Sequence, residues 1–347
     1  MTDGQLPPMA ARAGADPTTP DTSSLDSIIA ETPGVPSRTT ASGPRRLLRR
    51  AYSGALLVAG SAVLAARWEQ VGELVAGARP GPLAAALALG LVSLGQSAWF
   101  WTRGLTALGA ARPMGDVLDA TVAAIPARYL PGSIWYAAGR VGHLRRSGTP
   151  AVALATVAAV ETLLSFMIAV ALGSALLLLG GTTGGSVGVA GLVVLAGGLA
   201  LVASPWVVNP VLRWTVARKG IHAPPVLRWR AYLELCAHLV AFWAASAAAF
   251  LCYLASFPAI HTPGIARTAG TFLMAWAAGF VAVFAPQGAG VFETTLAGLL
   301  TGAPVAALAV VIAGYRALTA VRDGLALASL AALRSLSSRR PADQVGR

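Results

Sequence analysis

The chain has 347 residues, of which 56% are hydrophobic and only 12% are charged, whereas a soluble domain carries roughly a quarter charged residues. Its mean hydropathy of +0.66 and its apolar blocks of about twenty residues, the length that spans a bilayer, exclude a cytosolic enzyme, a secreted disulfide scaffold and a fibrous protein. The net charge of +12 is spread over short loops between apolar blocks, as in membrane proteins, rather than over one nucleic-acid-binding face. The sequence therefore predicts an all-α, polytopic membrane helix bundle with no nucleic-acid partner.

The first 44 residues differ in composition from the rest of the chain. They hold seven prolines, many Ser and Thr and few large apolar side chains, so they cannot bury enough surface to offset their ordering entropy. We expect residues 1–44 to be a disordered cytoplasmic tail. A basic cluster at 45–50 directly precedes the first apolar run and, by the positive-inside rule, places the N-terminus in the cytoplasm. The transmembrane domain is then expected at 45–335, with a short cytoplasmic tail at 336–347.

Apolar segments of two kinds follow. Six are uninterrupted and are each expected to cross the membrane once: 51–67, 82–101, 151–179, 187–208, 232–256 and 304–330. Two more, 117–139 and 268–302, are interrupted by Pro and Gly.

Flanking charges predict how the two interrupted segments behave. Segment 117–139 has arginines on both sides and only 23 residues, enough to reach the midplane and return, because about eleven helical residues cover roughly 16 Å. Segment 268–302 must also return to its own side if the C-terminal arginines are to lie in the cytoplasm. The sequence thus predicts about six spans and two re-entrant hairpins that open to opposite sides, a possible inverted repeat with a substrate site between its halves.

Ionisable residues within the first half mark one candidate site. Arg128 directly precedes the turn at 129–132. Its guanidinium suits an anionic lipid headgroup, although an ordinary ion pair, or a side chain that extends to the interface, is the alternative. Glu161 lies about ten residues into an apolar helix, hence about 15 Å deep. It either pairs with Arg128 or Arg140 for structural reasons, or takes part in a relay or a headgroup contact.

A second candidate site lies in the last third of the chain. Residues 285–290 break the apolar segment, because Pro286 removes a hydrogen-bond donor and the glycines permit unusual backbone turns. Glu293 is expected in the first turn of the next half-helix, where its charge complements the helix dipole. Arg316 is its natural counterpart in the final span. Such a pair can be architectural or functional, and we favour a site because both residues lie beside a broken helix.

These motifs together resemble a known family. Residues 128–135, Glu161, the turn at 286–290 with Glu293, and the Tyr315–Arg316 pair are similar in order and spacing to the lysylphosphatidylglycerol synthase transmembrane, or flippase-like, family. The resemblance covers roughly residues 50–335 and implies a lipid-handling membrane module. In multiple peptide resistance factors this domain translocates aminoacylated phosphatidylglycerol made by a separate cytosolic domain. Because little chain follows the last span, we expect no synthase domain here.

The expected function is therefore a flippase-like transporter of a phospholipid, glycolipid or polyprenyl-linked lipid in a bacterial plasma membrane. Arginines would neutralise phosphate, and Glu161 and Glu293 would bind either a cationic group or the arginines. The alternatives are a non-catalytic partner of a glycosyltransferase or lipid synthase, and a membrane lipid transferase. The sequence predicts no enzyme activity, cofactor or metal site, and it leaves the oligomeric state open. The candidate substrate-binding residues are Arg128, Tyr129, Pro131, Gly132, Arg140, Glu161, Pro286, Gly288, Gly290, Glu293, Tyr315 and Arg316.

Overall fold

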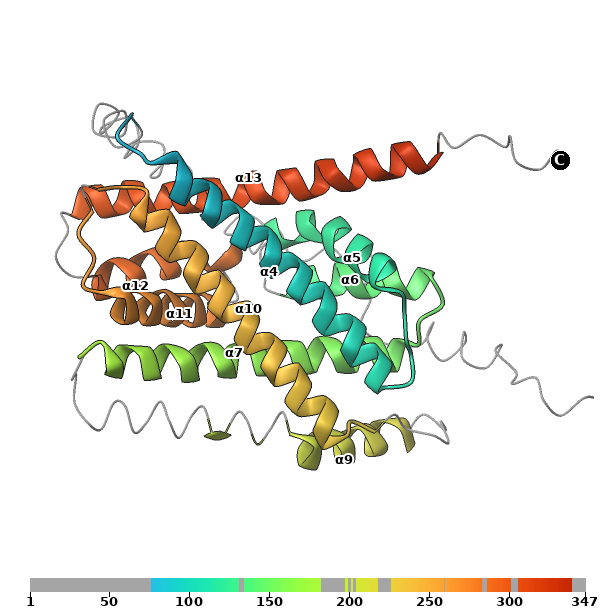
Figure 1. Cartoon of the computed structure of the whole chain (residues 1–347). Helices are drawn as coiled ribbons and strands as arrows, with labels where there is room; N and C mark the ends of the chain where they lie inside the picture. The colour runs from blue at the N-terminus through green and yellow to red at the C-terminus, as the bar shows by residue number, and fades with distance from the viewer. Residues whose placement is uncertain are drawn as a thin grey trace, which may run out of the picture. The chain divides into compact units, whose positions relative to one another are not determined.

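The computed structural model describes residues 76–130, 134–181, 197–198, 201, 204–217, 226–258, 260–282, 286–300 and 305–338. Within these ranges the regular elements are all helical, which confirms the predicted all-α class (Figure 1). They are α4 (Pro80–Ala107), α5 (Met114–Ala123), η1 (Ile125–Tyr129), α6 (Ile134–Arg146), α7 (Ala151–Leu179), α9 (Pro205–Ala217), α10 (Trp229–Ala255), α11 (Ile265–Val281), η2 (Pro286–Gly288), α12 (Val291–Leu299) and α13 (Val305–Ser338).

Three of the described helices, α4, α7 and α10, are long and apolar enough to cross a membrane. They correspond to three of the six predicted spans. Segment 51–67 and most of segment 187–208 lie outside the described residues. The last predicted span, 304–330, falls in α13, which continues to Ser338 and carries charged residues in its middle. The protein is therefore embedded in the membrane as a multi-pass helix bundle.

Proline and glycine define the ends of the long helices. Pro80 occupies the first turn of α4, where its missing N–H has no intrahelical acceptor in any case. Gly109, just beyond the end of α4, and Gly181, just beyond α7, both have a φ of +73°. Because glycine has no Cβ, it adopts this left-handed conformation readily and lets the chain leave the helix.

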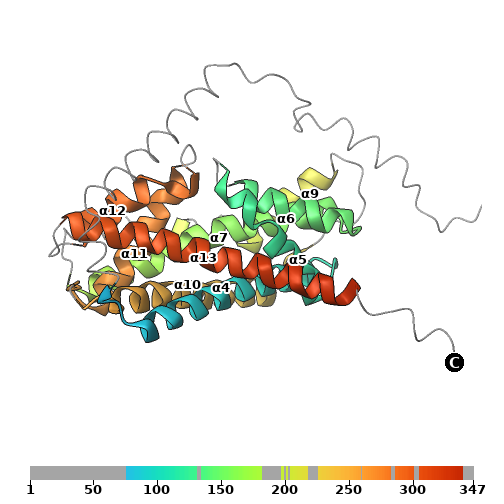
Figure 2. The same cartoon turned by 90° about the horizontal axis from the view of Figure 1, so that it is seen from above.

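The two interrupted segments form two helical hairpins, as predicted. The first hairpin consists of α5, η1 and α6, and the second of α11, η2 and α12. Figures 1 and 2 show the helical arms of the two hairpins at opposite ends of the bundle, and the tips η1 and η2 are in contact with each other. Each hairpin thus reaches the interior from its own end. Residues 131–133, part of the predicted first turn, lie outside the described residues.

The halves α4–α7 and α10–α13 repeat the same order of elements: a long helix, a hairpin and a second long helix. Their contacts repeat as well. α4 packs on α10, α11 on α7 and α5 on α13, while α10 contacts α7 and α4 contacts α13. Exchanging the two halves leaves this set of contacts unchanged, and the hairpins point in opposite directions. The fold is therefore arranged as an inverted repeat, although the two halves show no obvious similarity in sequence.

Close packing between helices relies on small residues. A Cβ on Gly270 of α11 would lie 2.8 Å from the carbonyl oxygen of Gly173 on α7, so only glycine allows this approach of the two backbones. Interfaces of this type are common in membranes, where helix association depends on close van der Waals contact rather than on a hydrophobic driving force. The α7–α11 contact in this way fixes the second hairpin against the first half of the fold.

Candidate functional site

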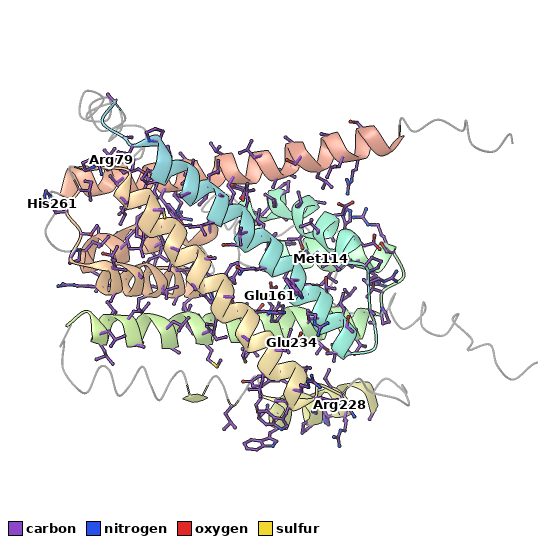
Figure 3. The ribbon with its side chains drawn as sticks, viewed as in Figure 1. Arg79, Met114, Glu161, Arg228, Glu234 and His261 are labelled. Atoms are coloured by element: carbon purple, nitrogen blue, oxygen red, sulfur yellow. The ribbon has the colours of Figure 1, made fainter. Side chains whose placement is uncertain are left out.

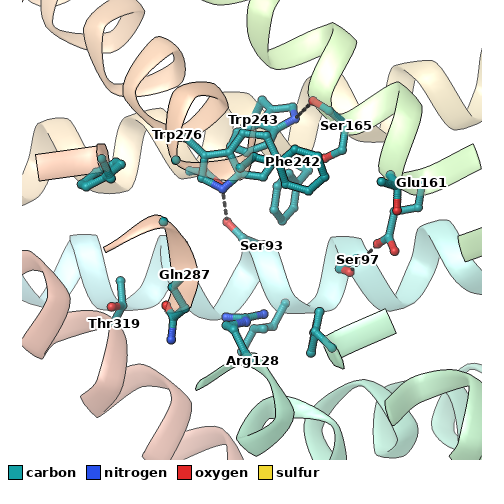
Figure 4. A pocket seen from close by; sticks show the side chains of 18 of the residues that line it. Ser93, Ser97, Arg128, Glu161, Ser165, Phe242, Trp243, Trp276, Gln287 and Thr319 are labelled. Carbon is teal, nitrogen blue, oxygen red and sulfur yellow. Dashed lines mark hydrogen bonds between the residues drawn. The ribbon is translucent and has the colours of Figure 1, made fainter. Parts of the chain in front are cut away.

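A cavity of about 310 Å³ lies between the tips of the two hairpins. Its walls come from both halves of the fold, including η1 and α6 of the first hairpin and α11, η2 and α12 of the second. Figure 4 shows Arg128 and Gln287 on one side of this cavity and Phe242, Trp243 and Trp276 on the other. The cavity thus has a cationic, polar side and an aromatic side.

The first ion pair at the cavity joins α6 to α7. Arg140 Nη1 lies 3.2 Å from Glu161 Oε1 and also donates to Ser97 Oγ at 3.1 Å. Glu161 accepts two more hydrogen bonds, from Ser97 Oγ at 3.1 Å and from Trp101 Nε1 at 2.7 Å. Figure 3 shows Glu161 toward the middle of the bundle, whereas Arg228 lies near one end of α10. Of the two partners proposed for Glu161 from the sequence, the structure selects Arg140.

Arg140 is held between aromatic rings. Its guanidinium carbon lies 4.8 Å from the Trp101 ring centre and 4.3 Å from that of Tyr136, distances at which ring quadrupoles attract a cation. The side chain is only 2% exposed, and its Nε has no hydrogen-bond partner among the described residues. A buried donor without a partner is costly, and Arg140 lines the cavity. It therefore places a positive charge at the cavity wall.

The second ion pair joins α12 to α13 and has the reverse polarity. Arg316 Nε lies 2.7 Å from Glu293 Oε1, as the sequence predicted. Arg316 also donates from Nη2 to the carbonyl oxygen of Gln287 at 3.1 Å, and its guanidinium carbon lies 4.7 Å from the Phe292 ring centre. The arginine belongs to the hairpin in the first half and to the long helix in the second. In both halves, the pair connects the second arm of a hairpin to the helix that follows it.

The tip of the second hairpin has an unusual backbone. Gln287, Gly288 and Gly290 all have positive φ angles, of 50°, 65° and 89°. At Gly288 a Cβ would lie 2.5 Å from the Cα of Gly279 on α11, so the tip packs directly onto its own first arm. Gly290 then caps α12, and its N–H donates to Glu293 Oε2 at 2.6 Å. The glycines predicted at this turn are thus required by conformation and by space.

The tip of the first hairpin is attached to α13 through Asp323, which is only 2% exposed. Its Oδ2 accepts from the Tyr129 hydroxyl at 3.0 Å and lies 3.4 Å from Arg128 Nη1. Its Oδ1 accepts from Arg322 Nε and Nη2 at 2.9 and 2.6 Å. Arg128 lines the cavity and lies with its guanidinium carbon 4.4 Å from the Tyr136 ring centre. Both the ion pair and the cavity position considered for Arg128 are therefore present.

The predicted site residues take different places around this cavity. Six of them line it: Arg128, Arg140, Glu161, Gly288, Tyr315 and Arg316. Three more lie outside the lining but are bonded to the site. Tyr129 donates to Asp323, and Glu293 accepts from Arg316 and from the Gly290 N–H. Pro286 begins η2, while Pro131 and Gly132 lie outside the described residues. Tyr315 packs edge-on against Phe250 and Phe272, with ring centres 5.0 and 5.8 Å away, and so connects the polar side to the aromatic side.

Several residues of the site were not selected from the sequence. The most important are Ser97, Trp101, Tyr136, Arg322 and Asp323. Asp323 carried a usable signal, because an acid within an apolar helix requires a partner. Ser97, Trp101 and Tyr136 carried none, since such residues are ordinary in membrane helices and acquire a role only through the packing around them.

Fold and site together define a multi-pass membrane protein whose two opposed broken hairpins enclose a cavity with paired charges. The sequence-family model of the lysylphosphatidylglycerol synthase TM region matches residues 52–322. This range includes nearly all of the repeat and both the Arg140–Glu161 and the Arg316–Glu293 pair. The chain belongs to this family, and the suspected resemblance is confirmed. Comparison with curated proteins gave no significant match.

Proposed function

We propose that the protein moves a phospholipid or glycolipid between the two leaflets of a bacterial plasma membrane, with the lipid headgroup passing through the cavity. The observation that supports this proposal most directly is the meeting of the two hairpin tips beside a cavity of about 310 Å³. Broken helices and irregular backbone within a membrane are tolerated where they face protein or a polar cavity. Transporters with inverted repeats bind their substrates in this kind of place.

The size and chemistry of the cavity fit a headgroup rather than a whole lipid. Ligand pockets for small molecules commonly measure about 300–1,000 Å³, and 310 Å³ is at the lower end of that range. Charged and hydroxyl groups cover one side, which would replace the water around a phosphate, while the acyl or isoprenoid chains remain in the bilayer. This division keeps the apolar part of the substrate in an apolar solvent throughout.

Movement of the headgroup requires the two tips to separate, and α13 holds both of them. Arg316 holds η2 through Glu293 and Gln287, and Asp323 holds η1 through Tyr129 and Arg128. The two α13 residues are about two helical turns apart and thus lie on the same side of the helix. In the proposed mechanism, rocking of one repeat against the other loosens one attachment while the other stays closed, so that the cavity opens to one side at a time.

The test is reconstitution of the full-length protein into liposomes that contain labelled phospholipids or a labelled polyprenyl-linked sugar. Transfer between leaflets above that of empty vesicles is the expected result for at least one lipid class. If neither class moves faster than in empty vesicles, the proposal is wrong.

A non-catalytic role as partner of a glycosyltransferase or lipid synthase is the second proposal, and the same preparation separates it from the first. If the protein only assembles with an enzyme, a substitution at the Arg316–Glu293 pair should change complex formation. Lipid movement should then equal that of empty vesicles both for the wild-type protein and for the variant. A transporter should instead lose measured lipid movement when this pair is altered.

A further inference from the structure

The charges around the cavity indicate which headgroup it accepts, and this inference rests on the function proposed above. We propose that the substrate carries a single phosphodiester charge and an uncharged, hydroxyl-bearing headgroup, and that the cavity rejects headgroups with a net positive charge. An aminoacylated lipid would then be excluded. The proposal follows from the state of the carboxylates, the state of the arginines and the lining of the opposite wall.

Every carboxylate among the described residues of the site is already paired with an arginine. Both oxygens of Glu161 are occupied, by Ser97, Arg140 and Trp101. Both oxygens of Glu293 are also occupied, by Arg316 and the Gly290 N–H. The same holds for Asp323, whose four donors come from the tip of the first hairpin and from Arg322. An ammonium group would therefore find each of these negative charges already compensated by an arginine.

The arginines, in contrast, have donors to spare. A guanidinium offers five N–H groups, and each arginine at the cavity uses only some of them on protein acceptors. Arg140 and Arg128 both line the cavity, and their guanidinium carbons lie 4.3 and 4.4 Å from the same Tyr136 ring centre. The proposed phosphate subsite is therefore the part of the cavity that Arg128 and Arg140 line together.

Net charge points to one negative charge on the ligand. Among the described residues, four arginines line the cavity, at positions 128, 140, 316 and 322, together with Glu161. Glu293 and Asp323 are bonded to these arginines from just outside the lining. This group carries one positive charge in excess, which a single phosphodiester would neutralise. A lipid with a net positive headgroup would instead add to the excess in a setting where water screens it poorly.

The wall opposite the arginines suits an uncharged headgroup with hydroxyls. Phe242, Trp276 and Phe280 line it with half-buried rings, which can cover the apolar face of a glycerol or sugar. Thr162 and Thr319 line the cavity as well, and each already donates its hydroxyl hydrogen to a carbonyl of its own helix. Their remaining lone pairs accept hydrogen bonds, as ligand hydroxyls require.

The experiment measures which lipids stay bound to the purified full-length protein. The protein in detergent is mixed with equal amounts of phosphatidylglycerol, phosphatidylinositol, a polyprenyl phosphate sugar and lysyl-phosphatidylglycerol, and retained lipids are counted by native mass spectrometry. We expect retention of at least one of the first three to exceed that of the lysyl lipid by about tenfold or more, since several charged hydrogen bonds distinguish them. The first three arms separate a glycerol from a sugar-like headgroup.

The variant R140Q/E161Q removes the phosphate subsite without leaving a buried charge unpaired, and it should lose this preference. The matched control R103Q/E234Q removes an exposed ion pair near one end of α4 and α10. This control should still retain the anionic lipids in preference to the lysyl lipid. Equal or greater retention of the lysyl lipid, or retention of no lipid, would overturn the inference. If anionic retention is selective but no lipid changes leaflet in liposomes, it is the proposed function that is wrong instead.

Discussion

The hydroxyl of Tyr129, at the end of the first hairpin's tip, donates a 3.0 Å hydrogen bond to Asp323 on the last long helix. These residues are separated by 194 positions in the chain, yet together with Arg128 they attach one half of the repeat to the other. Asp323 is 2% exposed and also pairs with Arg322 of its own helix, so the hairpin tip supplies two of the three residues that donate to it.

The first prediction concerns removal of the Asp323 charge. D323N leaves Arg128 and Arg322 without their carboxylate and should destabilise the protein by about 3–5 kcal/mol, as expected when one partner of a buried ion pair is lost. Thermal unfolding in detergent measures the effect. The matched control is D119N, which removes an exposed partner of Arg334 and should cost about 0–1 kcal/mol. Equal losses in the two variants would show that Asp323 does not hold the tip.

Part of this architecture could be predicted from the sequence. Pro and Gly at 286–290 located the second break, because these residues disrupt helices wherever they occur. Pro131 and Gly132 lie outside the described residues, but the position predicted from them falls between η1 and α6. The charge rule gave the hairpins opposite directions, and the rarity of charge in apolar helices singled out Glu161, Glu293 and Arg316. Each of these inferences needs only local chemistry.

Other features depend on packing that a single sequence does not reveal. Membrane helices are apolar on all sides, so their pattern gives little indication of which face meets which neighbour. Glu161 therefore had two possible partners, and only the rotation of α6 against α7 selects Arg140 over Arg128. The aromatic wall depends in the same way on how α10 and α11 face the cavity. The positive φ of Gln287 is equally hidden, since residues other than glycine rarely adopt it.

The second prediction is energetic coupling between Arg140 and Glu161. R140Q and E161Q each leave one buried charge without its partner, so each should destabilise the protein more than the double variant R140Q/E161Q. A double-mutant cycle on unfolding free energies should give a coupling of about 0.5–3 kcal/mol, the range for residues in direct contact. Additive effects of the two single changes would mean that the 3.2 Å contact contributes nothing to stability.

The third prediction tests the close approach at the second tip. G288A places a methyl group 2.5 Å from the Gly279 backbone at a φ of +65°, and the combined strain and overpacking should cost about 2–4 kcal/mol. The control G298A lies in α12 with nothing within 4 Å of the added Cβ. There alanine should be neutral or stabilise the helix by about 0.5–1 kcal/mol. Unfolding temperatures that fall by the same amount for both would argue against a strained tip.

The fourth prediction separates the charge of Arg316 from its geometry. In R316K the positive charge is retained, but a single ammonium cannot reproduce the planar fork that reaches Glu293 and the Gln287 carbonyl together. Because arginine and lysine are not interchangeable where two acceptors are held at once, lipid movement in liposomes should fall by about tenfold. The unfolding temperature should change little, since the Glu293 charge still has a partner.

The matched control for this variant is R334K, on the same helix but with a side chain that is 51% exposed. It should move lipid at the wild-type rate, because Arg334 lies outside the cavity lining. Wild-type movement by R316K would show that charge alone suffices at this position, and the second hairpin would then not need the bond to Gln287 in order to work. A drop in both variants would point to a general effect of lysine in α13 rather than to the tip.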